Sequence, residues 1–303
     1  MGLIETQEQI RRLLDDNGAI LLAHYYQRDE IQDIADILGD SLALSMEAAE
    51  TTADVIVFAG VRFMAESASI LSPDKTVLLP RLDAGCPLAD KITVEELQQA
   101  RTEHPGAKVV AYVNSSAQIK AHSDICCTSA NAVRIAGSLD ADTILMVPDG
   151  NLARYTAQFL EKEIIPWKGF CYVHNNLVPG DIRKVKDAHP GAPVAVHPEC
   201  RPEVTAMADF VGSTGGILTF AREADAQEII IGTEQGIMHQ LEKESPGKTF
   251  IPASDNLICL DMKRITLDDI LSSLLEMKHV IRVPEEIRVP AGLALSRMLE
   301  ASK

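Results

Sequence analysis

The sequence predicts an α/β protein made of three homologous parallel-sheet units, each with αβα (Rossmann-like) layering, arranged with pseudo-threefold symmetry around a central site. Two observations predict this class. Short apolar runs typical of buried parallel strands alternate with segments of helical periodicity, and the same landmarks recur about every 87 residues. No Pro/Gly/Ser-rich linker divides the 303 residues, so the repeat alone indicates the domain organisation.

The first elements follow from local pattern. Residues 19–23 and 55–59 are apolar runs of strand length, and the apolar residues between Ile31 and Leu38 recur at helical spacing. We therefore expect a strand, a helix over 31–38 and a second strand.

Helix starts and strand ends are the first repeated landmarks. Helix-start signals stand at Thr6, Thr93, Gly180 and Thr266, at intervals of 87, 87 and 86 residues. Each of the first three helices leads through a turn into a strand that ends in polar residues. These strand ends are His24-Tyr25-Tyr26, Tyr112-Val113-Asn114 and His197-Pro198-Glu199.

A serine at a helix start and one cysteine complete each unit. The serines, which N-cap preference places at helix starts, are Ser41, Ser129 and Ser213, the last followed by Thr214. The cysteines are Cys86, Cys171 and Cys259, separated by 85 and 88 residues. The landmarks predict units at 1–88, 89–174 and 175–261, with a C-terminal tail, 262–303, that packs back on the first unit.

Composition excludes several classes of function. With 28 Lys and Arg against 44 Asp and Glu, the net charge of −16 argues against nucleic acid or an anionic membrane as a partner. No apolar run approaches the roughly 18 residues of a membrane helix, and the first residues do not resemble a secretion signal. We expect a soluble, cytoplasmic protein.

Three cysteines in register predict a metal. If the strand ends converge, the three thiols meet at one point, where thiolates bind a soft metal. Structural zinc favours closely spaced ligand pairs that this chain lacks, so a [4Fe-4S] cluster with one open iron fits better. The alternative is that all three are buried free cysteines. For Cys126, Cys127 and Cys200 we favour packing over a redox switch.

Helix N-termini at the serines suit carboxylates or phosphate, although simple capping explains any one of them. Tyr26 and Glu199 are the best acid–base candidates, because each lies two residues beyond the start of its strand-end motif. Other polar groups could assist, although a lone strand-end histidine is more often structural. They are His24, Tyr112, Asn114, His174 and His197.

Six strings in order resemble the quinolinate synthases over about residues 20–300. The strings are residues 23–27 (AHYYQ), 85–90 (GCPLAD), 112–116 (YVNSS), 127–131 (CTSAN), 197–200 (HPEC) and 212–216 (GSTGG). The resemblance implies a transferase of de novo NAD biosynthesis. It condenses iminoaspartate, the product of L-aspartate oxidase, with dihydroxyacetone phosphate to give quinolinate, phosphate and water.

The resemblance also implies roles for individual residues. Cys86, Cys171 and Cys259 correspond to the ligands of a [4Fe-4S] cluster. Tyr26 and Glu199 correspond to the acid–base pair, with His197 and Tyr112 as further catalytic residues. The substrate-contacting positions are His24, Ser41, Tyr112, Val113, Asn114, Ser129, His174, His197, Pro198, Glu199, Ser213 and Thr214.

One departure and two alternatives accompany this interpretation. Some members carry C-x₂-C-x₂-C near the last ligand, but here Met262 follows Cys259 three residues later, which excludes a redox disulfide there. Another iron-sulfur hydro-lyase acting on a hydroxy diacid would fit the serines but not the ordered strings. An organic-acid-binding module with a structural metal is the other alternative.

Overall fold

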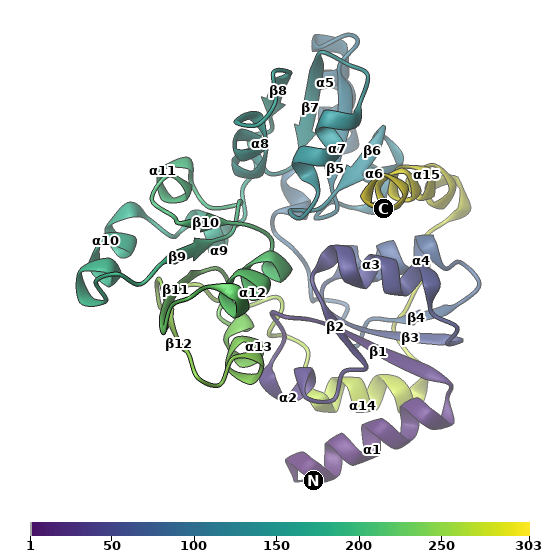
Figure 1. Cartoon of the computed structure of the whole chain (residues 1–303). Helices are drawn as coiled ribbons and strands as arrows, with labels where there is room; N and C mark the ends of the chain where they lie inside the picture. The colour runs from purple at the N-terminus through teal and green to yellow at the C-terminus, as the bar shows by residue number, and fades with distance from the viewer. Residues whose placement is uncertain (1) are drawn as a thin grey trace.

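Three parallel-dominated sheets, each flanked by helices, surround a common centre in the computed structural model, which describes residues 2–303 (Figure 1). The predicted fold class is confirmed. The first unit, purple to blue in Figure 1, contains α1 (Leu3–Asp16), β1 (Ala19–His24), α2 (Asp29–Gln32), β2 (Ile37–Gly39), α3 (Ser41–Glu50), β3 (Val55–Ala59), α4 (Arg62–Leu71) and β4 (Thr76–Leu78).

The middle and third units follow in chain order. The middle unit contains η1 (Ala89–Lys91), α5 (Val94–Glu103), β5 (Lys108–Tyr112), α6 (Ala117–Ala121), β6 (Ile125–Cys127), α7 (Ala132–Ser138), β7 (Thr143–Val147), α8 (Gly150–Ala157), β8 (Glu163–Pro166) and α9 (Tyr172–Asn175). The third unit contains α10 (Pro179–Ala188), β9 (Val194–Val196), α11 (Pro202–Thr205), β10 (Phe210–Val211), α12 (Thr214–Glu223), β11 (Glu228–Gly232), α13 (Ile237–Glu244) and β12 (Thr249–Pro252).

The three sheets share one strand order. In each unit the first strand lies between the second and the third, and the fourth lies beside the third, giving β2-β1-β3-β4, β6-β5-β7-β8 and β10-β9-β11-β12. All these pairings are parallel, so the carboxyl ends of one unit's strands lie at one edge of its sheet. Ligands of such sheets bind at that edge, beside the strand where the order reverses.

The C-terminal tail contacts two units. It contains α14 (Leu267–Glu276), β13 (Val280–Ile281) and α15 (Glu285–Ser302). On the first unit α14 packs against α1 and β13 pairs antiparallel with β4, whereas α15 lies beside α6 and β6 of the middle unit (Figure 1). We propose the unit boundaries that the repeat indicates, with this tail joining the first two units.

The prediction of a helix over residues 31–38 is wrong. Only α2 is helical there, and Ile37 and Leu38 lie in β2, paired with β1. Ile37 and Leu38 fit an edge strand as well as a helix, and their pairing with β1 decides the conformation. Two helix starts also differ: α1 begins after Gly2 rather than at Thr6, and α10 after Val178 rather than at Gly180. Thr93 and Thr266 are N-caps as expected.

One aspartate that the sequence landmarks missed recurs in all three units. Asp36, Asp124 and Asp209 each accept a hydrogen bond, at 2.8 Å, from the backbone N–H of the residue 15 positions earlier, in the first strand of the unit. Each also faces a basic side chain on the first helix of its unit; these are Arg11, Arg101 and Lys186. The contact fixes the loop between the first two strands in the same way three times.

We expect Asp124→Ala to lower the free energy of unfolding by about 1–2 kcal/mol at neutral pH, because the Val109 N–H loses its charged acceptor. Burial opposes ionisation of Asp124, but that N–H and the Arg101 and Lys108 side chains outweigh it and lower its pKa. The stabilisation is therefore present above the unfolded pKa of about 3.9 and is lost as the pH falls through the folded value.

Urea unfolding across this pH range measures the effect. The difference between wild type and Asp124→Ala should shrink in acid, and the exposed Asp140→Ala serves as the control that leaves stability unchanged. A constant difference down to the most acidic samples would contradict a charge-based contact.

Candidate active site

One buried cavity lies where the carboxyl ends of the three sheets meet. Most of the predicted site residues line it, and every unit contributes. They are His24, Tyr26, Ser41, Cys86, Tyr112, Asn114, Ser129, Cys171, His174, His197, Glu199, Thr214 and Cys259. Val113, Pro198 and Ser213 do not line it: the Val113 N–H donates to the Cys127 carbonyl, Pro198 lies in the turn before Glu199, and Ser213 caps α12.

The three cysteines come from equivalent places. Cys86 follows β4, Cys171 follows β8 as the N-cap of α9, and Cys259 follows β12. All three are free and line the same cavity. Burial raises the pKa of each thiol, that of Cys86 to about 12, so a cation must stabilise the thiolates if they are to form.

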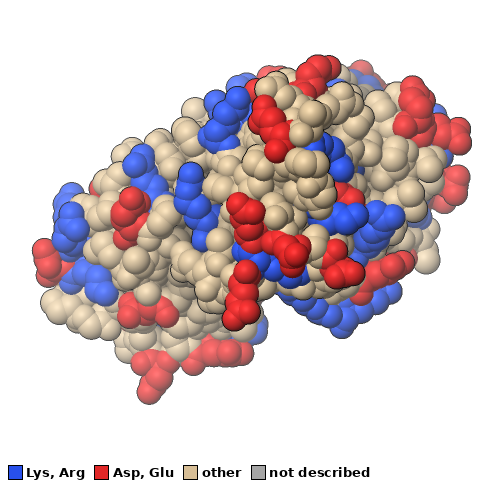
Figure 2. All heavy atoms as spheres, turned by 90° about the horizontal axis from the view of Figure 1, so that it is seen from above, with Lys and Arg blue, Asp and Glu red and all other residues tan. Residues whose placement is uncertain are grey.

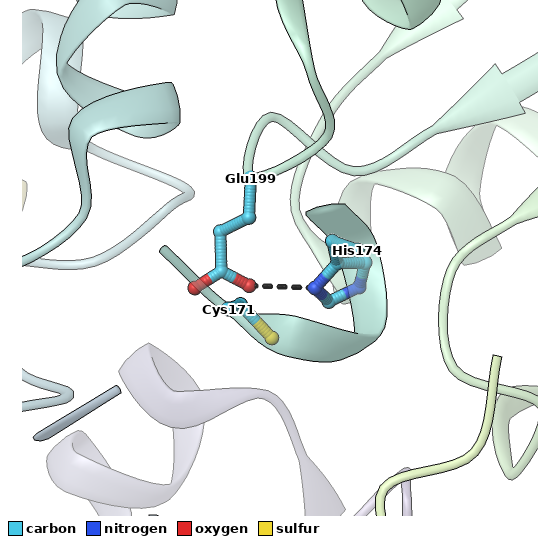
Figure 3. A group of neighbouring side chains, drawn as sticks. All are labelled: Cys171, His174 and Glu199. Atoms are coloured by element: carbon cyan, nitrogen blue, oxygen red, sulfur yellow. Dashed lines mark ion pairs between the residues drawn. The ribbon is translucent and has the colours of Figure 1, made fainter. Parts of the chain in front are cut away.

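Glu199 and two histidines form a buried cluster in this cavity. His174 Nδ1 lies 2.8 Å and His197 Nδ1 3.2 Å from Glu199 Oε2, and the two imidazole rings stack with centroids 4.4 Å apart. Figure 3 shows the His174 ring and the Glu199 carboxylate pointing toward each other, with Cys171 beside them. Burial opposes ionisation of Glu199, but the two imidazoles outweigh it and hold its pKa below the usual range.

Several polar atoms of this cluster lack partners. His174 Nδ1 is close to Glu199 but poorly aligned, so the two atoms are in contact without forming a hydrogen bond. Glu199 Oε1 and Asn114 Oδ1 have no hydrogen-bond partner at all. Because buried polar atoms are normally satisfied, these three mark where a ligand would bind.

Strand-end histidines in the first and third units share one backbone contact. The N–H of the residue two positions on donates to Nδ1, from Tyr26 to His24 at 3.1 Å and from Glu199 to His197 at 3.3 Å. Burial lowers the pKa of both histidines, that of His24 to about 3, so both are neutral at physiological pH. At His24, Nδ1 accepts, which assigns the ring proton to Nε2. At His197 the same nitrogen also lies 3.2 Å from the Glu199 carboxylate, to which a protonated Nδ1 would donate.

Tyr26 is linked to the cluster through Thr233, a residue that the sequence reasoning missed. The Tyr26 hydroxyl lies 2.7 Å from Thr214 Oγ1 and 2.6 Å from Thr233 Oγ1, and Thr233 Oγ1 lies 2.9 Å from His174 Nε2. Burial raises the pKa of Tyr26 well above 10. The rule that polar residues follow strand ends would have found Thr233, which comes directly after β11.

The predicted serine caps need correction. Asp40, not Ser41, caps α3, accepting from the Leu42 and Ala43 N–H groups. Asn131 is the N-cap residue of α7, so Ser129 lies in the turn before it. Only Ser213 caps as expected, on α12, and its hydroxyl also donates to Asp40. At α3 the Asp40 carboxylate already accepts from N–H groups that an anionic ligand would need, so of the three predicted serine caps only Ser213 stands at a helix N-terminus as expected.

The cavity also has lining residues that the sequence did not predict as site residues. They are Asp40, Val61, Phe63, Gly85, Val173, Glu234 and Met262. Within residues 2–303, Cys171, His174 and Glu199 also form a group whose ligand atoms all lie within 4.8 Å of one another, close enough to hold a metal ion (Figure 3). No helix in that range has the length and apolarity needed to cross a membrane. On the face drawn in Figure 2, Lys and Arg are interspersed with Asp and Glu.

The fold and the site together define an α/β enzyme whose active site is assembled by three sheet-containing units, with thiols, imidazoles, a carboxylate and a phenol facing one cavity. A family model described as "Quinolinate synthetase A protein" matches residues 8–300. The chain belongs to the quinolinate synthase family.

Curated relatives agree over nearly the full length. A protein named quinolinate synthase from Geotalea uraniireducens is 58% identical over 295 residues, covering 97% of each chain. One of the same name from Methanoregula boonei is 55% identical over 293 residues, again covering 97% of each. One from Methanosarcina barkeri is 51% identical over 299 residues, or 99% of this chain and 98% of that protein.

Proposed function

We propose that this protein is a transferase that condenses iminoaspartate with dihydroxyacetone phosphate to give quinolinate, phosphate and water, in the biosynthesis of NAD. The observation that carries the proposal is that one cysteine from each of three units faces the same buried cavity as Glu199 and Tyr26. Membership of the quinolinate synthase family and the names of its relatives support the product. We place the reaction in the cytoplasm, with L-aspartate oxidase as the source of iminoaspartate.

Cys86, Cys171 and Cys259 are proposed to hold a [4Fe-4S] cluster. Three soft thiols around one cavity fit such a group, and each would lose its proton on binding the cluster iron. When bound, a cluster with three protein ligands supplies an open iron, a Lewis acid suited to dehydration. The His174 and Glu199 side chains remain free to act on the substrate.

Neutral donors and a helix N-terminus are proposed to bind the substrate carboxylates. His24 carries its ring proton on Nε2, and His197 Nε2 lies 3.2 Å from Ser129 Oγ, so His197 and Ser129 can contact the same carboxylate. Asn114 supplies an amide whose oxygen has no partner in the protein. Helix α12 begins at Thr214 and directs its positive end toward the cavity.

Glu199 and Tyr26 are proposed to move protons. Glu199 is ionised at neutral pH and therefore has a free carboxylate to accept a proton from the substrate, whereas Tyr26 keeps its proton and can donate it. The Thr233 hydroxyl contacts both Tyr26 and His174, and His174 Nδ1 lies 2.8 Å from Glu199 Oε2, so a realignment of the His174 ring would complete a path that returns a proton from Glu199 toward Tyr26 without bulk water. This closed path suits repeated tautomerisation and loss of water.

We expect Thr233→Val to slow quinolinate formation about 100-fold, because the near-isosteric side chain interrupts the path from Tyr26 to His174. Thr205→Val makes the same change at a threonine that only bonds the Pro202 carbonyl on α11, and it should stay within about twofold of wild type. Steady-state rates with both substrates measure the effect. Equal rates for the two variants would remove Thr233 from proton transfer.

Omission of one substrate tests the reaction class. The proposal requires both iminoaspartate and dihydroxyacetone phosphate for any product. Water loss from a hydroxy diacid alone, without the triose phosphate, would instead identify a hydro-lyase.

A further inference from the structure

Two buried carboxylates occupy equivalent places in the middle and third units, and neither has a part in the proton path above. Asp149 lies two residues beyond β7, and Glu234 two residues beyond β11, which are the third strands of their units. The exposed fraction is 1% for Asp149 and 0% for Glu234. Burying a carboxylate is costly, so each must be compensated by close donors.

Each carboxylate joins a local turn to the backbone of a cysteine. Asp149 accepts from the Leu152 N–H at 2.8 Å and, through its other oxygen, from the Cys171 N–H at 3.0 Å. Glu234 accepts from the Gly236 N–H at 2.7 Å and, through its other oxygen, from the Cys259 N–H at 3.0 Å. The two units therefore use the same device to fix a cysteine-bearing loop against the end of a central strand.

The first unit lacks this device. Val61 stands two residues beyond β3, and the loop before Cys86 is held by a backbone bond from the Arg62 N–H to the Ala84 carbonyl at 2.8 Å. No side chain takes part in that bond. The carboxylates are thus specific to Cys171 and Cys259.

Glu234 also connects its cysteine to the first unit. The Lys263 ammonium lies 3.2 Å from Glu234 Oε1 and donates to the backbone carbonyl of Tyr26 at 2.5 Å. The Arg28 side chain in turn donates to the Lys263 carbonyl at 2.9 Å. One carboxylate therefore helps to fix both the Cys259 loop and the backbone of Tyr26.

We propose that Asp149 and Glu234 are positioning residues that hold Cys171 and Cys259 in place to bind the cluster; this inference rests on the proposed function. A loop already fixed by two hydrogen bonds from backbone N–H groups to one carboxyl group loses little freedom when its sulfur binds a metal, so the bound state is favoured. A neutral amide of the same shape has only one oxygen, and its NH₂ group would face one of the two N–H donors.

The test compares four amide variants of the reconstituted holoenzyme. Asp149→Asn and Glu234→Gln are expected to lose iron to a chelator at least about tenfold faster than wild type. The decrease in the visible absorbance of the cluster measures this rate. Asp124→Asn and Asp209→Asn are matched controls, because each also alters a carboxylate that accepts a backbone N–H in the same unit, away from the cysteines. Thermal unfolding of each apoprotein measures general stability.

Faster iron loss in the first pair than in the controls at comparable melting temperatures supports the positioning role. Retention equal to wild type in Asp149→Asn and Glu234→Gln overturns it, and so does equal loss in all four variants. If one of the pair does not fold, the other decides, since the two lie in separate units. A wild-type protein that takes up no iron overturns the proposed function instead, and this inference with it.

Discussion

Cys86→Ala, Cys171→Ala and Cys259→Ala are each expected to abolish binding of the [4Fe-4S] cluster. All three thiols face one cavity, and no further cysteine lines it among residues 2–303. No other thiol can therefore replace a missing ligand. Anaerobic iron and sulfide analysis of each purified variant makes the measurement. Quinolinate formation should fall below detection in all three.

Cys200→Ala is the matched control. Cys200 lies next to Glu199 in the chain, but its thiol is 1% exposed, points to the Gly232 carbonyl and packs in the core of the third unit. This variant should keep its full content of iron. Full iron in any of the three ligand variants, or loss of iron in Cys200→Ala alone, would contradict the ligand assignment.

Glu199→Gln is expected to keep the cluster and to slow quinolinate formation about 1000-fold. The amide preserves the size of the buried side chain but cannot accept a proton at neutral pH, although His174 and His197 remain beside it. The rate with both substrates and the iron content of the same sample are the two measurements. Glu203→Gln, an exposed glutamate on α11, should retain the wild-type rate. Normal turnover in Glu199→Gln would exclude Glu199 as the base.

The repeat explains why the fold and much of the site could be predicted from the sequence. In an α/β unit, polar residues at strand ends stay at the sheet edge whatever the details of the helices, so His24, Tyr112 and His197 came to one cavity. Cysteines in register then had to meet at the same centre. The resemblance to quinolinate synthases assigned the chemistry that position alone left open.

Details that depend on competition between neighbours could not be predicted. Asp40 and Ser41 are adjacent and both good caps, and only the backbone conformation selects Asp40. Asp149 and Glu234 were not predicted because the positions two residues beyond the third strands hold Val61, Asp149 and Glu234, so no single residue type repeats there. Contacts between units, such as that of Tyr26 with Thr233, depend on how the units pack, so short sequence patterns do not predict them.

The most direct test of the proposed function is the stoichiometry of products from the anaerobically reconstituted protein. Supplied with iminoaspartate and dihydroxyacetone phosphate, it should release quinolinate and inorganic phosphate in equal amounts, and removal of the cluster should stop both. Protein that carries the cluster and binds both substrates but releases no quinolinate would contradict the account.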